Sequence, residues 1–259
     1  MELGFIITIF FIGFIGSFIS GMVGIGGSII KYPMLLYIPP ILGFAAFSAH
    51  EVSGISAIHV FFATIGGIYA YRKGGYLNRQ LILFMGVSVL IGSFIGGYGS
   101  TLLSENLINV VYAVLATIAT VMMFMPKKNV EDLPLDEVTF NKVIAAGSAF
   151  IVGIASGIVG AAGAFILMPI MLVVLRIPTK MAIASSLAIT FISSIGSTTG
   201  KIITDQIVWE PAIIMIVASL MAAPIGANVG KNMKTKSLQL ILGLLILAST
   251  VKIWLDLIG

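Results

Sequence analysis

A glycine-rich segment occurs twice in this chain. Residues 20–27 (SGMVGIGG) return 136 residues later as residues 156–163 (SGIVGAAG), and Pro33 and Pro169 follow the two copies at the same spacing. Paired Gly/Pro interruptions in corresponding apolar segments point to the binding site of a secondary transporter. Glycine lets a helix break, and the helix that begins after the break at Ser28 would present free N–H groups and a positive dipole end to an anion.

We therefore expect two helix N-termini, one from each copy, to bind one small anion, with nearby hydroxyl groups as further donors. The alternative is that the glycines only allow close helix packing, as small residues commonly do in membranes. The residues expected to bind the substrate are Ser20, Gly24, Gly26, Gly27, Ser28, Ser156, Gly160, Gly163, Ser185, Ser186 and Thr190.

Three ionisable residues lie in or next to apolar runs, where burial is costly and function is the default hypothesis. Glu51 and His59 are candidates for carrying a coupling proton, since histidine titrates near neutral pH. Lys31 follows the first glycine copy, so it could attract an anion or extend its ammonium to the membrane interface. We expect His50 to be solvated or locally paired at the outer interface.

The composition places these residues in a membrane protein. Hydrophobic residues make up 59% of the 259-residue chain and charged residues 9%, with a mean hydropathy of +1.14, whereas soluble domains carry roughly 25% charged residues. No soluble core of this length could bury so much apolar surface. There are no cysteines, which excludes disulfides and thiolate chemistry.

Apolar runs of about 20 residues predict membrane-spanning helices. Two shorter runs, Ser28 to Phe44 and Ala164 to Leu175, directly follow the glycine copies. The eight clear runs are Leu3 to Val23, Glu51 to Tyr71, Gln80 to Tyr98, Leu107 to Met125, Val143 to Val159, Met181 to Gly200, Pro211 to Gly230 and Leu238 to Ile258.

Lysine and arginine placement decides whether the short runs cross. If neither crosses, seven basic loop residues face one side and five the other; if both cross, eleven face one side and only Lys201 the other. The positive-inside rule favours the second arrangement, with both termini outside. Lys201 is then expected in an outer loop, where it could pair with Asp205.

The count predicts an all-α polytopic membrane protein in two halves, residues 1–126 and 140–259, joined by a polar cytoplasmic linker at 127–139. Each half makes five crossings, so the second half enters the membrane inverted relative to the first. Re-entrant helix pairs at the glycine copies, with three full crossings per half, preserve the inversion and are not distinguished by sequence.

The duplicated glycine segments and their prolines resemble those of the sulfite exporter TauE/SafE family of permeases. Residues 184–187 (ASSL) and 224–230 (PIGANVG) also look like that family's pattern. The resemblance covers nearly the whole chain and implies secondary transport of small sulfur-containing anions, such as sulfite or organosulfonates. The chain departs from the pattern at Lys31 and at Ala161 and Ala162.

We expect an exporter in the cytoplasmic membrane that works by alternating access around a midplane anion site. No Walker A, H-E-x-x-H or G-x-S-x-G motif occurs, so the sequence predicts neither an ATPase nor an enzyme. The alternatives are an anion channel and a carrier of a non-sulfur anion such as a carboxylate. The expected partners are the anion, the lipid bilayer and possible copies of the chain; no cofactor, metal or nucleic acid is expected.

Overall fold

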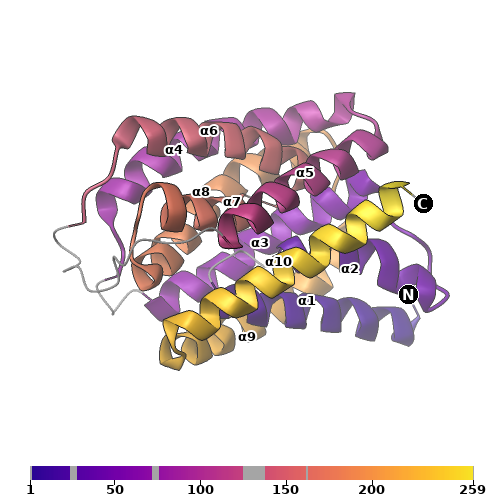
Figure 1. Ribbon diagram of the computed structural model, residues 1–259. Helices are drawn as coiled ribbons and strands as arrows, with labels where there is room; N and C mark the ends of the chain where they lie inside the picture. Colours follow the sequence, from indigo (N-terminus) through magenta and orange to yellow (C-terminus); the bar gives the residue numbers. More distant parts are fainter. Residues whose placement is uncertain (1, 24–27, 72–75, 125–137, 162, 259) are drawn as a thin grey trace.

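A computed structural model describes residues 2–23, 28–71, 76–124, 138–161 and 163–258 (Figure 1). The described residues form helices and no strands. In chain order these are α1 (Leu3–Val23), α2 (Ser28–Ile41), α3 (Ala49–Tyr71), α4 (Arg79–Gly99), the short η2 (Ser100–Leu102), α5 (Glu105–Phe124), α6 (Lys142–Val159), α7 (Ala164–Pro169), the π-helical η4 (Ile170–Val174), α8 (Thr179–Ile203), α9 (Trp209–Asn232) and α10 (Thr235–Ile258).

These helices confirm the predicted all-α polytopic class. Seven of them are long and apolar enough to cross a membrane: α1, α3, α4, α5, α6, α8 and α9. The short apolar runs form α2 and the pair α7–η4, and the eighth clear run forms α10.

Helix α2 returns the chain to the beginning of α1. The ring of Phe44, just after α2, packs edge-on against Phe5 with 5.6 Å between centroids, and it also lies against Gly4. Helices α1 and α3 both begin at this end of the bundle. Helix α2 and the loop after it therefore lead the chain from the end of α1 back to the end where α3 begins.

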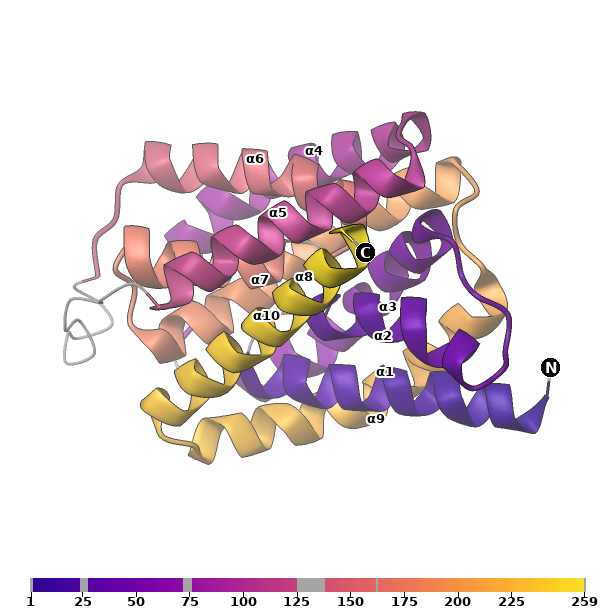
Figure 2. The same ribbon diagram turned by 45° about the vertical axis from the view of Figure 1, so that its right-hand side comes forward.

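The two halves of the chain interlock through glycine. Helix α4 packs along α6, and α1 packs along α9 (Figure 2). A Cβ on Gly96 would lie 1.9 Å from the carbonyl oxygen of Ile154, and one on Gly226 would lie 1.9 Å from that of Phe18. Such approaches are open only to glycine, so Gly96 and Gly226 serve close helix packing.

The contacting residues also give the helix directions. Gly153 of α6 meets Val89 of α4, and Gly157 meets Gly97, so α4 and α6 run parallel. In the pairs α1–α9, α3–α9 and α4–α8, residues later in one helix also contact residues later in the other, so these pairs run parallel as well.

Helices α3 and α8, by contrast, run antiparallel. The Phe61 and Phe191 rings stack at 5.0 Å, while Gly67 meets Leu187 further along α3 but earlier along α8. Helices α5 and α10 are also antiparallel, because Thr120 bonds Thr250 and Thr117 accepts from the Trp254 indole.

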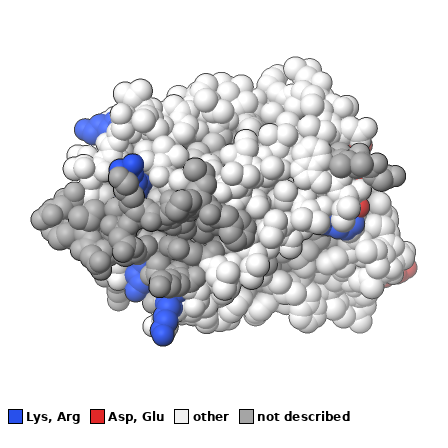
Figure 3. Space-filling view, in the orientation of Figure 1, with Lys and Arg blue, Asp and Glu red and all other residues white. Residues whose placement is uncertain are grey.

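Charge separates the two ends of the bundle. Most of the visible lysine and arginine side chains lie at the left of Figure 3, and the acidic side chains lie at the right with one basic group beside them. Both chain termini lie at the right in Figure 1. Basic residues mark the starts of α4, α6, α8 and α10: Arg79, Lys142, Lys180 and Lys234. The membrane side that each end faces stays a prediction.

Glycine packing between α4 and α6 yields a stability prediction. Gly96→Ala should destabilise the protein by about 1–3 kcal/mol, because the added methyl has no room against a backbone carbonyl. Gly147 of α6 has nothing within 4 Å of an added Cβ, so Gly147→Ala should be neutral or stabilising by up to about 1 kcal/mol. Thermal unfolding in detergent measures both; equal melting temperatures for the two variants would contradict the packing.

Candidate functional site

The second glycine copy breaks the chain as predicted. Helix α6 ends at Val159, where Gly160 takes a left-handed conformation with φ of 71° and returns its N–H to the carbonyls of Ser156 and Gly157. Gly163 is also left-handed, with φ of 72°, and α7 starts after it. In the first copy α1 ends at Val23 and α2 begins at the predicted Ser28, while Gly24, Gly26 and Gly27 lie outside the described residues.

The helix after the second break is short. Helix α7 has six residues before η4, and the amides of Ile166 and Leu167 bond the carbonyl of Gly163. The backbone stays helical from α7 into η4, so the two form one helix that begins directly after Gly163. Binding of an anion at its N-terminus stays a prediction.

A buried polar cluster joins α1, α2 and α3. Lys31 and His59 are both 0% exposed, and the Lys31 ammonium contacts the His59 Nδ1. The His59 Nε2 lies 2.9 Å from the Ser17 Oγ. Gly16 provides the space, since a Cβ there would lie 2.2 Å from Lys31 Cγ. Lys31 therefore reaches the interior, and the interpretation that it extends to the interface is wrong.

Helix α2 is held in this orientation by the residue after Lys31. Tyr32 is fully buried and stacks on Tyr112 of α5 at 4.6 Å, and its hydroxyl donates to Asn109 Oδ1 at 2.9 Å. An aromatic pair and a hydrogen bond thus fix which face of α2 points inward.

Several buried hydroxyls on the helices around this cluster have no protein partner. The Oγ atoms of Ser20, Ser56 and Ser193 and the Oγ1 of Thr190 are buried without a hydrogen bond. They belong to α1, α3 and α8, and Ser20 and Ser56 each lie one turn from a member of the cluster. Because buried hydroxyls are normally satisfied, these donors are available to a ligand.

The other predicted residues have structural partners. Glu51 caps α3, since its Oε2 accepts from the Ser48 N–H at 2.8 Å while the Ser48 Oγ accepts from the Glu51 N–H. Ser185 accepts from the N–H of Asn78, which caps α4. Ser156 donates to the Gly153 carbonyl, and a Cβ on Gly163 would lie 3.0 Å from its Oγ. Ser186 donates to the Ile183 carbonyl.

The predicted residues do not all come together. Ser185 precedes Lys201 by 16 residues on α8, about 24 Å along the helix. The Lys201 ammonium lies 3.1 Å from the carbonyl of Ile158, beside the second break. Ser185 and Gly160 therefore lie near opposite ends of the bundle.

The prediction that Lys201 lies in an outer loop is wrong. Its side chain is 0% exposed and lies in the last turn of α8, not in an outer loop. The ammonium donates to Ser53, Ser100 and Gln206, each at 2.7 Å, and not to Asp205. His50 joins the same cluster, 3.4 Å from the Gln206 Oε1. Gly54 leaves room for the Gln206 backbone to pack against α3. This glycine is the sequence feature that could have indicated the contact.

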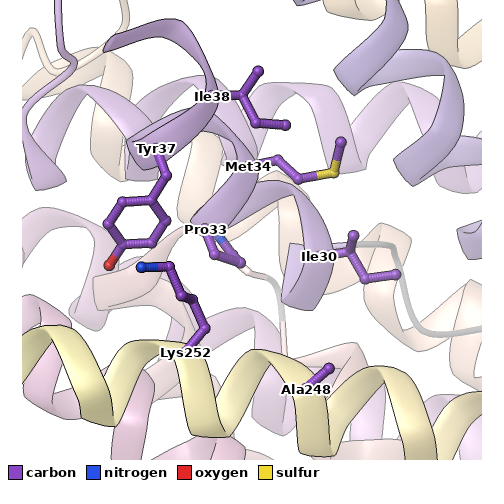
Figure 4. A pocket seen from close by; sticks show the side chains of 7 residues that line it. All are labelled: Ile30, Pro33, Met34, Tyr37, Ile38, Ala248 and Lys252. Carbon is purple, nitrogen blue, oxygen red and sulfur yellow. The ribbon is translucent and has the colours of Figure 1, made fainter. Parts of the chain in front are cut away.

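A separate pocket of about 290 Å³ lies between α2 and α10 (Figure 4). Its lining is apolar except near Tyr37 and Lys252, whose ammonium lies 4.3 Å from the Tyr37 ring centroid. Lys252 also pairs with Asp256 at 2.7 Å. Neither Lys31 nor His59 lines this pocket, so it is separate from the buried cluster.

A polytopic bundle with a helix break and a buried lysine–histidine cluster has the features of a membrane transporter. The sulfite exporter TauE/SafE family matches residues 9–253, and the chain belongs to that family. It is similar to the probable membrane transporter protein YunE of Bacillus subtilis, at 23% identity over 91% of this chain and 92% of that protein. It also resembles the probable membrane transporter protein MJ0441 of Methanocaldococcus jannaschii, at 25% identity over 89% and 88%. No solved structure matches the chain.

The second break predicts a strong contrast between two glycines. A Cβ on Gly160 would meet the Ser53 carbonyl oxygen at 1.8 Å in addition to the left-handed strain, whereas Gly43, with φ of 85°, has nothing within 4 Å. Gly43→Ala should cost about 1–2 kcal/mol from strain alone. Gly160→Ala should cost clearly more, measured as the difference in melting temperature. Similar losses in both variants would show that the break does not depend on this contact.

Proposed function

We propose that this protein is a secondary transporter, working as an exporter, of small sulfur-containing anions such as sulfite or organosulfonates. The observation that carries the proposal is the buried Lys31–His59 pair next to helices that bear unpartnered hydroxyls. Membership in the family supports the class of transporter and the general chemistry of the substrate.

The chemistry of the cluster suits a small oxyanion. An ammonium group removed from water needs a compensating charge or several acceptors, and an anion drawn to Lys31 would supply both. Ser20, Ser56 and Thr190 would add hydroxyl donors from three helices. A sulfite or sulfonate head has three oxygens, which is enough to accept from the ammonium and from two hydroxyls at once.

The same pair offers a way to couple the anion to a proton. When Lys31 donates to His59 Nδ1, the imidazole carries its hydrogen on Nε2 and donates it to Ser17. Protonation of Nδ1 would end the contact and set two cations side by side. A bound anion would stabilise that second charge, so anion and proton would bind together. Glu51, held in its capping box at the start of α3, has no part in this exchange.

We further propose that the halves form an inverted-topology repeat. Helices α1 and α3 run parallel to α9, whereas α6 and α8 run parallel to α4, and α3 opposes α8 as α5 opposes α10. Each long helix of the first half thus runs against its counterpart in the second. Such repeats support alternating access by rocking of one half against the other. The basic end would face the cytoplasm and both termini the outside of the cell membrane.

A carrier or channel for a non-sulfur anion is the second candidate. An ammonium binds carboxylates as a point charge just as it binds sulfonates, so Lys31 alone does not select sulfur. Measuring the transport of a panel of sulfur-containing and carboxylate anions therefore distinguishes the two candidate functions.

Reconstituted protein should exchange sulfite or ethanesulfonate across liposomes with saturable counterflow. Lys31→Met should lower the flux at least tenfold, because the buried charge is lost. His59→Gln should retain flux but flatten its pH dependence, and Glu51→Gln should leave both unchanged. Lys252→Met is the control, since that side chain is 50% exposed. Wild-type flux from Lys31→Met would refute the site; ohmic currents would favour a channel, and flux of carboxylates alone the second candidate.

The inverted topology can be tested directly because the chain contains no cysteine. Single cysteines at the exposed positions Arg79 and Lys234 should react with a membrane-impermeant thiol reagent only from the cytoplasmic side. A cysteine at the exposed Thr101 should react from the outside. Labelling of the first two positions from opposite sides would rule out the inversion.

A further inference from the structure

A second buried lysine lies at the end of the bundle opposite the basic loops. Lys201 is enclosed by oxygen atoms from three helices and one loop: Ser53 of α3, Ser100 of η2, the Ile158 carbonyl of α6 and Gln206 in the loop after α8. Ser53 and Ser100 belong to the first half of the chain, and the others to the second. This Lys201 cluster therefore ties the two halves together at the end where both termini lie.

The acceptors around Lys201 are all neutral. Within the described residues its hydrogen bonds go to two hydroxyls, one amide oxygen and one main-chain carbonyl. The salt bridge found in these residues is Lys252–Asp256, elsewhere on α10. A side chain that only filled this space would be less costly if apolar, because an ammonium without a counter-charge is expensive to bury.

The cluster also covers the second helix break. The carbonyls in the last turn of a helix have no partner within the helix. Those of Ser156 and Gly157 are satisfied by the chain folding back at Gly160, and that of Ile158 accepts from Lys201. Gly160 in turn lies against the Ser53 backbone. Separating Lys201 from its partners would therefore open this end of the bundle beside the break.

We propose that Lys201 is a latch that closes the outer end of the transporter, and that its ammonium binds the anion when the latch opens. This inference rests on the proposed transport function. In the closed state the charge is held by four neutral oxygens; in the open state an oxyanion replaces some of them and compensates the charge. The anion thus favours the open state, and Lys201 forms an outer binding site distinct from the Lys31–His59 pair.

Thiol labelling at a position under the latch tests the proposal. Ile207 is 6% exposed, adjoins Gln206 and has no side-chain hydrogen bond, so Ile207→Cys reports opening without altering the cluster. An impermeant maleimide added outside cells should label it slowly. Adding Lys201→Met should speed labelling at least tenfold, whereas Lys201→Arg should stay near the parent rate. Thr101→Cys, exposed at the same end, should label quickly in every background.

The anion provides the second arm of the experiment. Ethanesulfonate is used because sulfite reacts with maleimides. It should raise the labelling rate of Ile207→Cys severalfold when Lys201 is present and have no effect with Lys201→Met. Lys252→Met, which removes an exposed lysine, should behave as the parent. If Lys201→Met does not fold, Ser53→Ala removes one acceptor and should also speed labelling.

The outcomes separate the latch from the proposed function. A folded Lys201→Met variant that labels as slowly as the parent, while the parent transports sulfonate, would overturn the latch alone. An ethanesulfonate response that persists in Lys201→Met would overturn the outer binding site. A parent protein that carries no sulfur anion and no carboxylate in liposomes would overturn the proposed function, whatever the labelling shows.

Discussion

Helices broken inside the bundle impose the constraint on which this structure depends. In a membrane, the polar groups released by a break must be satisfied by protein. The break after α6 meets this requirement locally through the Gly160 amide and at long range through Lys201, which donates to the Ile158 carbonyl. These bonds lie within the second half of the chain, and the first half approaches the same break where the Ser53 backbone packs against Gly160.

Helix α3 connects the two buried lysines. Ser53 accepts from Lys201, and His59, six residues later on the same helix, contacts Lys31. The two contacts are about 9 Å apart along the helix axis, and the unpartnered Ser56 lies between them in the sequence. A displacement of α3 would therefore act on both cations. One helix therefore contacts both lysine clusters directly.

The sequence predicted the helices well because burial in lipid requires long apolar runs. The expected start of α2 at Ser28 and the break at Gly160 are both confirmed, since glycine and hydropathy report backbone properties locally. The direction in which a side chain points, by contrast, could not be predicted from the sequence. Nothing in the sequence around Lys31 or Lys201 says which face of its helix meets protein, so both burials were missed or left open. The unpartnered hydroxyls depend on contacts across three helices and could not be read from one chain segment.

The stacked pair Tyr32–Tyr112 restricts how a substrate can reach the interior. It fixes the rotation of α2 about its own axis, because turning the helix would separate rings that lie 4.6 Å apart and break the bond to Asn109. The lysine one residue earlier therefore cannot turn outward to the surface of the bundle. Helix α2, anchored to α5 through Tyr32, therefore holds the Lys31 side chain inside the bundle and against His59 of α3.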